Sequence, residues 1–166
     1  MRCGRRAGSR FWGGSDLESL ARQMPREETG QGELGPYVPG RKTLVVVEDD
    51  DETRELEVFL LGSEGYHVIG LPDGEGAAET IAREAADLVI LDLMMPRKDG
   101  IAVLEELAGE PATAEIPVIL VSAYVDRPAV LKALPRSSQV KQIFRKPFDI
   151  TGLLDAVAQH LTPSER

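Results

Sequence analysis

Carboxylates stand directly after two apolar runs of this 166-residue sequence. The run 44–47 ends at Glu48 and Asp49, and the run 88–91 ends at Asp92, four residues before a proline. Short apolar runs bounded by turn residues are typical of buried strands. Open α/β sheets bind their ligands at the carboxyl ends of such strands. We therefore predict that Asp92 accepts a phosphoryl group.

A hydroxyl group and an ammonium group follow two later apolar runs. Ser122 comes after the run 117–121, and Lys146 follows the run 140–144. If these runs are parallel strands of one sheet, both side chains share an edge with Asp92. Lys146 can then pair with a phosphoryl oxygen as a point charge, and Ser122 can donate a hydrogen bond to another.

Three carboxylates placed together repel one another, so one of them would be protonated unless a cation joined them. Mg²⁺ suits such a site, because it binds oxygen ligands and combines one or two carboxylates with phosphate oxygens and water. The sequence thus predicts Mg²⁺ at Glu48, Asp49 and Asp92. The product on Asp92 would be an aspartyl phosphate, a covalent intermediate that carboxylates form.

The elements that must position these residues alternate between strand and helix five times. This pattern predicts an α/β fold, a doubly wound five-stranded parallel sheet with helices on both faces. We expect the strand order 2-1-3-4-5 of a flavodoxin-like three-layer sandwich. The expected strands are 44–47, 66–71, 87–91, 117–121 and 140–144, and the expected helices are 52–63, 77–82, 101–108, 128–134 and 149–161.

Helical spacing selects the side of the first helix that should face the sheet. Leu56, Phe59 and Leu60 recur at intervals of three and four residues, so we expect them to form its buried face.

Composition excludes several classes of function. The net charge of −9 argues against nucleic-acid binding through the surface of the domain. A single cysteine, Cys3, forms no intrachain disulfide and fits a reducing compartment. No apolar run reaches the roughly 20 residues that span a bilayer, and no apolar signal region follows the N-terminal arginines. We expect a cytoplasmic protein without a membrane partner.

The domain boundaries follow from a change in composition. Residues 1–40 are rich in Gly, Arg, Glu and Pro and carry too little apolar surface to fold alone. We expect a disordered or weakly helical N-terminal tail, one domain over 41–162 and a short C-terminal tail over 163–166. The alternative for the N-terminal tail is a docking helix anchored by Phe11 and Trp12.

Four motifs, in this order, resemble the receiver domain of two-component response regulators, in the chemotaxis-receiver-like superfamily. The resemblance covers about residues 42–161, and four motifs on four different strand ends are far more specific than one. The motifs are Val46–Asp50, Leu91–Pro96 with Asp99-Gly100, Val121–Ala123 and Lys146–Phe148.

The resemblance implies a role for each motif. It implies Asp92 as phosphoacceptor and Mg²⁺ bound by Asp49, Asp92 and the backbone carbonyl of Met94, with Glu48 acting through water. The phosphodonor would be a phosphohistidine on a sensor histidine kinase or a phosphotransfer protein. Such a receiver catalyses its own phosphorylation and dephosphorylation and is not a dedicated enzyme.

Two features depart from the family pattern. The aromatic switch residue usually lies three positions before the lysine, where this chain has Ile143, and Phe144 should face the opposite side of its strand. No effector domain follows the last helix, so we expect a single-domain regulator that signals or relays through protein contacts. A homodimer through the helix at 128–134, the strand at 140–144 and the last helix is the family's habit.

Alternative functions remain open on the sequence alone. A degenerate receiver would act as a phosphorylation-independent interaction module, although the complete acidic set and Lys146 speak against it. A phosphoaspartate hydrolase would need a second acid two residues after Asp92, where Met94 stands. A flavin-binding protein of the same topology would need Gly, Ser or Thr in the strand-end loops to bind phosphate, and these loops carry acids instead.

Removal of residues 1–40 should leave the melting temperature and the phosphorylation of the domain nearly unchanged, because this segment has little apolar surface to bury. Thermal denaturation and intact-mass measurement of the truncated and full chains test this expectation. A large loss of stability would instead show that the tail docks on the domain.

Overall fold

The computed structural model describes residues 40–125 and 138–161, which contain five strands and four helices. The elements follow one another in alternation, as the sequence predicts. They are β1 (Thr43–Val47), α2 (Asp51–Ser63), β2 (His67–Leu71), α3 (Ala77–Arg83), β3 (Leu88–Asp92), α4 (Gly100–Gly109), β4 (Val118–Ser122), β5 (Val140–Arg145) and α6 (Ile150–Leu161).

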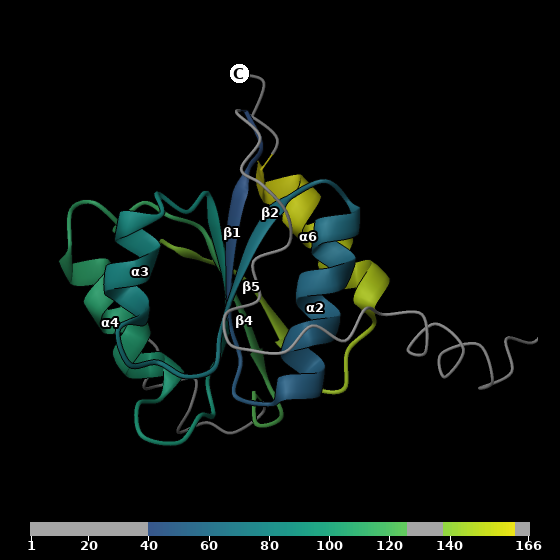
Figure 1. The fold of residues 1–166 in the computed structure, drawn as a ribbon. Coiled ribbons are helices and arrows are strands. Elements are labelled where there is room, and N and C mark those ends of the chain that lie inside the picture. Colours follow the sequence, from purple (N-terminus) through teal and green to yellow (C-terminus); the bar gives the residue numbers. More distant parts are fainter. Residues whose placement is uncertain (1–39, 126–137, 162–166) are drawn as a thin grey trace, which may run out of the picture. The chain divides into compact units, whose positions relative to one another are not determined.

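The five strands form one parallel sheet in the order β2-β1-β3-β4-β5. Helices α3 and α4 cover one face of the sheet, and α2 and α6 cover the other (Figure 1). The predicted three-layer fold and strand order are therefore confirmed. The helix expected at 128–134 and the N-terminal tail lie outside the described residues.

The three central strands consist of apolar residues almost throughout because both of their faces are covered. Every residue of β1, β3 and β4 is buried. Successive side chains point to opposite layers, so Val45 and Val47 join the core with α3 and α4, whereas Leu44 and Val46 join the core with α2 and α6. The central strands are thus packed on both faces, and polar groups can stand at their ends.

One extra residue interrupts the pairing of β4 with β5. Val118 pairs with Val140, but the next residue of β4, Ile119, pairs with Gln142. Beyond this irregularity, Phe144 packs against the core with α2 and α6, and Ile143 is 37% exposed. The prediction that Ile143 and Phe144 face opposite sides of the strand is confirmed.

The predicted buried face of the first helix is wrong for Leu56 and Phe59. These side chains are 46% and 42% exposed, and α2 instead buries Glu57, Val58 and Leu61. A polar contact lies on the buried side of the helix, where Arg54 donates a hydrogen bond to the carbonyl of Glu48 at 2.8 Å. Residues three, four and seven positions after Arg54 share its side of the helix, and these are the three buried residues.

Glu57 is an acid buried in this core. Its side chain is 1% exposed, and in the described part of the chain neither carboxylate oxygen has a hydrogen-bond partner. Burial, together with a smaller contribution from the charge of Glu48, raises the pKa of Glu57 to about 8. Glu57 is therefore neutral in the folded protein at pH 7 but ionised in the unfolded chain. This difference costs stability on the order of 3 kcal/mol at pH 7.

Glu57→Gln should stabilise the domain, and the gain should grow as the pH rises. The folded protein holds a proton that the unfolded chain has released, so native stability falls between pH 4.5 and about 8. Urea denaturation at pH 5.5 and pH 8 measures the difference. Glu55→Gln, at an exposed position of the same helix, is the matched control. A gain from Glu57→Gln that is equal at both pH values would contradict the expectation.

Candidate functional site

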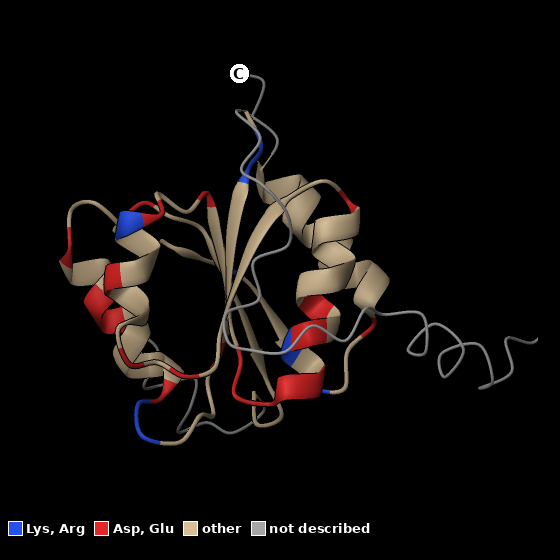
Figure 2. Ribbon diagram, in the orientation of Figure 1, with Lys and Arg blue, Asp and Glu red and all other residues tan. Residues whose placement is uncertain are grey.

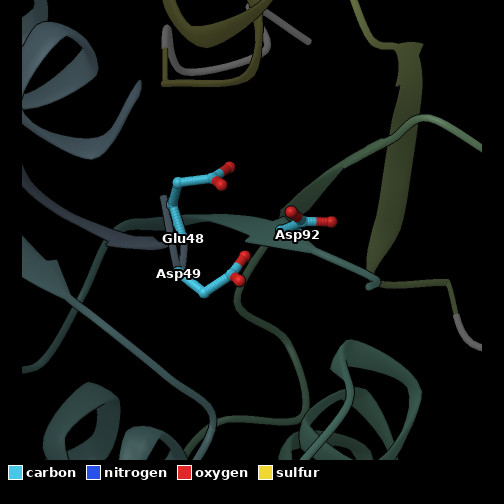
Figure 3. A group of neighbouring side chains, drawn as sticks. All are labelled: Glu48, Asp49 and Asp92. Atoms are coloured by element: carbon cyan, nitrogen blue, oxygen red, sulfur yellow. The ribbon is translucent and has the colours of Figure 1, made fainter. Parts of the chain in front are cut away.

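Three carboxylates meet at the carboxyl ends of the neighbouring strands β1 and β3. Glu48 and Asp49 follow β1, and Asp92 is the last residue of β3 (Figure 3). One carboxylate oxygen from each residue lies within 4.8 Å of the others. Glu48 and Asp92 are buried, whereas Asp49 is exposed. The structure thus brings together the three acids that the sequence selected.

The wider setting of the site is also acidic. Acidic segments gather at the same edge of the sheet, in the β1–α2 loop and at the adjoining end of α2 (Figure 2). This edge is the topological switch point, because the chain leaves β1 and β3 toward helices on opposite faces of the sheet.

Lys146, directly after β5, supplies the positive charge within this group. Its Nζ donates hydrogen bonds to Glu48 Oε2 at 2.5 Å and to Asp92 Oδ2 at 2.7 Å. Burial acts to lower the pKa of Lys146, but its hydrogen bonds to Asp92 and Glu48 outweigh this effect and raise the pKa above its usual range. Lys146 is therefore a permanent cation that links two buried carboxylates.

Residues at the start of α2 hold Glu48 through the carboxylate oxygen that Lys146 does not contact and through its carbonyl. Its Oε1 accepts a hydrogen bond from the backbone N–H of Asp50 at 3.3 Å, and its carbonyl accepts from Arg54. Asp50 caps α2 through the backbone N–H of Thr53 at 2.8 Å. Burial raises the pKa of Glu48, while the hydrogen bond from Lys146 opposes this rise.

The loop after β3 orients the carboxylate of Asp92. Its Oδ1 accepts a hydrogen bond from the backbone N–H of Met94 at 2.8 Å, which leaves Oδ2 for Lys146. Gly100 lies so close to the carbonyl oxygen of Asp92 that a Cβ at position 100 would overlap it. The backbone N–H of Gly100 also donates to the carbonyl of Leu93 at 3.1 Å. The end of the loop is therefore held against its beginning.

Ser122 ends β4 and is fully buried. Its hydroxyl oxygen accepts a hydrogen bond from the backbone N–H of Tyr124 at 3.1 Å. Its carbonyl accepts from the backbone N–H of Lys146 at 2.9 Å, which ties β4 to the lysine. The expected donation from Ser122 to a phosphoryl oxygen and the expected binding of a cation by the Met94 carbonyl stay predictions.

Arg54 is a residue of this region that the sequence reasoning missed. It links the carbonyl of Glu48 to the carboxylate of Asp51. The side-chain carbons of Arg54 lie beside Gly70 on β2, where a Cβ would approach them to 3.2 Å. The spacing of three residues between Asp51 and Arg54 is an ion-pair signal that the sequence does contain.

Comparison with known protein families identifies the chain. Residues 44–158 match the model of the response regulator receiver domain, and the chain belongs to this family. The transcriptional regulatory protein PdtaR of Mycobacterium tuberculosis is 33% identical over 121 residues, which are 72% of this chain and 56% of that protein. The chain spans between 23% and 56% of the length of curated relatives that it matches.

Solved structures show the same fold. The BeF3-activated N-terminal receiver domain of RstA from Klebsiella pneumoniae is 30% identical, with a TM-score of 0.62 over 74% of this chain and 100% of that one. The receiver domain of the sensor histidine kinase PA1611 from Pseudomonas aeruginosa, with magnesium coordinated in its active-site cleft, has a TM-score of 0.65 at 21% identity. That match covers 75% of this chain and all of the other, and it bears on the fold alone.

No helix in the described residues is long and apolar enough to span a lipid bilayer.

Lys146→Met should destabilise the domain by about 3 kcal/mol, because it leaves two buried carboxylates without their counter-charge. Urea denaturation at neutral pH without divalent cations measures this loss. Lys141→Met, at an exposed position of β5, removes the same charge outside the site and is the control. Equal stability of the two variants would show that the bonds of Lys146 to Glu48 and Asp92 contribute little.

Proposed function

We propose that this receiver domain takes a phosphoryl group onto Asp92 from a phosphohistidine. The observation that carries the proposal is the arrangement around Asp92. Its carboxylate is bonded to the Lys146 ammonium at 2.7 Å and lies within 4.8 Å of the carboxylates of Glu48 and Asp49. Phosphoryl transfer depends on positioning and on neutralisation of charge, and this combination of an acceptor, a fixed cation and two further acids that can bind a metal supports both.

The donor atoms of the site fit Mg²⁺. They are hard carboxylate oxygens at the mouth of the sheet, and one of them, from Asp49, is accessible to solvent. We propose Asp49, Asp92 and the Met94 carbonyl as direct ligands, with Glu48 acting through water. The receiver domain of PA1611, which has the same fold, coordinates magnesium in its own active-site cleft. When bound, Mg²⁺ would neutralise phosphoryl oxygens and reduce the repulsion among the acids.

The side chains then divide the chemistry among them. An oxygen of Asp92 attacks phosphorus while the bond from phosphorus to the donor's imidazole nitrogen breaks, and the imidazole takes up a proton. Lys146 turns from the free carboxylate of Asp92 to an oxygen of the transferred group and balances its charge. Ser122 donates a hydrogen bond to another oxygen. Glu48 retains its contact with Lys146, so the ammonium stays within reach throughout.

Partners and location follow from this role. The donor is a sensor histidine kinase or a phosphotransfer protein in the cytoplasm, and the phosphorylated domain signals or relays through protein contacts. The domain binds no nucleic acid or membrane directly, and it is a phosphoacceptor rather than a dedicated enzyme. Self-association through the last helix and β5 stays a prediction, because the helix expected beside them lies outside the described residues.

A degenerate receiver that only binds partners is the second candidate. Ile143 favours it, because an isoleucine replaces the aromatic residue with which receivers usually report phosphorylation. The hydrogen bonds of Lys146 to both buried acids argue for retained chemistry, since a module that never carried phosphate would not need this charged arrangement.

Incubation with Mg²⁺ and a small acyl phosphate should add one phosphoryl group to the protein. Intact-mass spectrometry detects the adduct, and Asp92→Asn should abolish it. Asp155→Asn, at an exposed position of α6, is the matched control and should retain the adduct. Absence of an adduct on the native protein would favour the degenerate receiver, and its survival in Asp92→Asn would overturn Asp92 as the acceptor. Slow decay of the adduct would separate a receiver from a phosphoaspartate hydrolase.

A further inference from the structure

The loop after β2 lies against the loop that follows Asp92. Residues 72–76 connect β2 to α3, and residues 93–99 connect β3 to α4. Both loops run along the same edge of the sheet, beneath α3 and α4 (Figure 1). The loop 72–76 contributes none of the residues assigned above to the phosphoryl or cation site, so its contacts with the second loop need another explanation.

An ion pair joins the two loops. The carboxylate Oδ2 of Asp73 accepts a hydrogen bond from the guanidinium of Arg97. The other oxygen, Oδ1, accepts from the backbone N–H of Glu75 at 2.8 Å, which fixes the carboxylate in place. The backbone φ angle of Arg97 is +67°, a left-handed conformation that is uncommon for a residue other than glycine. The surroundings of Arg97 therefore hold it in an unfavourable conformation.

A close backbone contact adds to the ion pair. Gly74 is buried, and a Cβ built on it would lie 2.7 Å from the carbonyl oxygen of Lys98 and 2.8 Å from a methyl carbon of Val103. Only a residue without a side chain permits this approach. The side chain of Lys98 in turn pairs with Glu106 of α4 at 2.5 Å.

The loop 93–99 is itself hydrogen-bonded to Asp92, so the contacts of Asp73 and Gly74 with this loop also restrain Asp92. The backbone N–H of Met94 bonds the Asp92 carboxylate, and the backbone N–H of Gly100 bonds the carbonyl of Leu93. The segment between these two bonds includes Arg97, which Asp73 holds from outside. A displacement of this segment would move the Met94 amide and with it the rotamer of Asp92.

We propose that Asp73 and Gly74 form a clamp on the β3–α4 loop and act as positioning residues for the carboxylate of Asp92. This inference rests on the proposed function for its effect on phosphorylation, but the clamp itself is a property of the two loops. The clamp acts through the backbone of the second loop and touches no reacting atom.

Two variants test the clamp by different routes. Gly74→Ala inserts a methyl group against the Lys98 carbonyl. Asp73→Asn keeps an oxygen for the Glu75 amide and replaces the oxygen that faces Arg97 by an NH₂ group, so it remains informative if Gly74→Ala fails to fold. Gly109→Ala adds the same methyl group at a position with no atom within 4 Å and is the matched control.

Amide hydrogen exchange, followed by NMR on the full chain, is the direct readout. We expect the Met94 and Gly100 amides to exchange several-fold faster in Gly74→Ala and in Asp73→Asn than in the native protein or in Gly109→Ala. Unchanged exchange at Met94 and Gly100, or an equal increase in Gly109→Ala, would overturn the clamp. A merely structural loss would accelerate exchange throughout the sheet.

The rate of phosphorylation by an acyl phosphate is the second readout. We expect it to fall roughly tenfold in Gly74→Ala, since a misplacement of about 1 Å in a reacting group can cost about 100-fold. Faster local exchange with an unchanged rate would refute the role in positioning Asp92. If the native protein gains no phosphoryl group at all, the proposed function fails while hydrogen exchange still decides the clamp.

Discussion

The ammonium of Lys146 lies between two carboxylates that are almost fully removed from water. Burial of an isolated carboxylate is costly, and the cation that β5 delivers offsets this cost for Glu48 and Asp92 at the ends of β1 and β3. That delivery in turn requires the parallel sheet, which gathers the carboxyl ends of the three strands at one edge. The strand order, the covering helices and the cap of α2 by Asp50 all maintain this one electrostatic arrangement.

The fold and the core of the site were predictable because they depend on periodic and local signals. Short apolar runs separated by helical segments determine a doubly wound sheet, and an acid after a run must lie at its carboxyl edge. The positions of Asp92, Glu48 and Asp49 at this edge were predicted in this way, and Lys146 was placed there because it follows β5; their roles stay predictions. The Met94 amide bond to Asp92 was not, because a backbone hydrogen bond leaves no trace in residue identity.

The rotation of α2 shows why other features escaped prediction. The helix has apolar residues on two sides, so periodicity alone fits either face. The side of α2 that faces the sheet carries Arg54, whose guanidinium donates a hydrogen bond to the Glu48 carbonyl while its side-chain carbons lie beside Gly70. The buried side of α2 therefore combines this polar contact with the burial of Val58 and Leu61, and it places Glu57 in the core while Leu56 and Phe59 stay exposed. Sequence patterns show where apolar residues recur, but they do not show contacts such as those of Arg54 with the Glu48 carbonyl and with Gly70, which form only in the folded chain.

The extra residue in β5 determines which face of the sheet each later side chain of the strand points to. Side chains alternate with a period of two, so one inserted residue exchanges the two layers for everything downstream. In uninterrupted pairing from Val118 with Val140, position 143 would lie opposite Val121 in the core with α2 and α6, and Phe144 would face the other layer. Because of the irregularity near Lys141, Phe144 instead packs against the core with α2 and α6. The layer that an aromatic side chain of this strand enters is therefore decided by a count of residues as much as by chemistry.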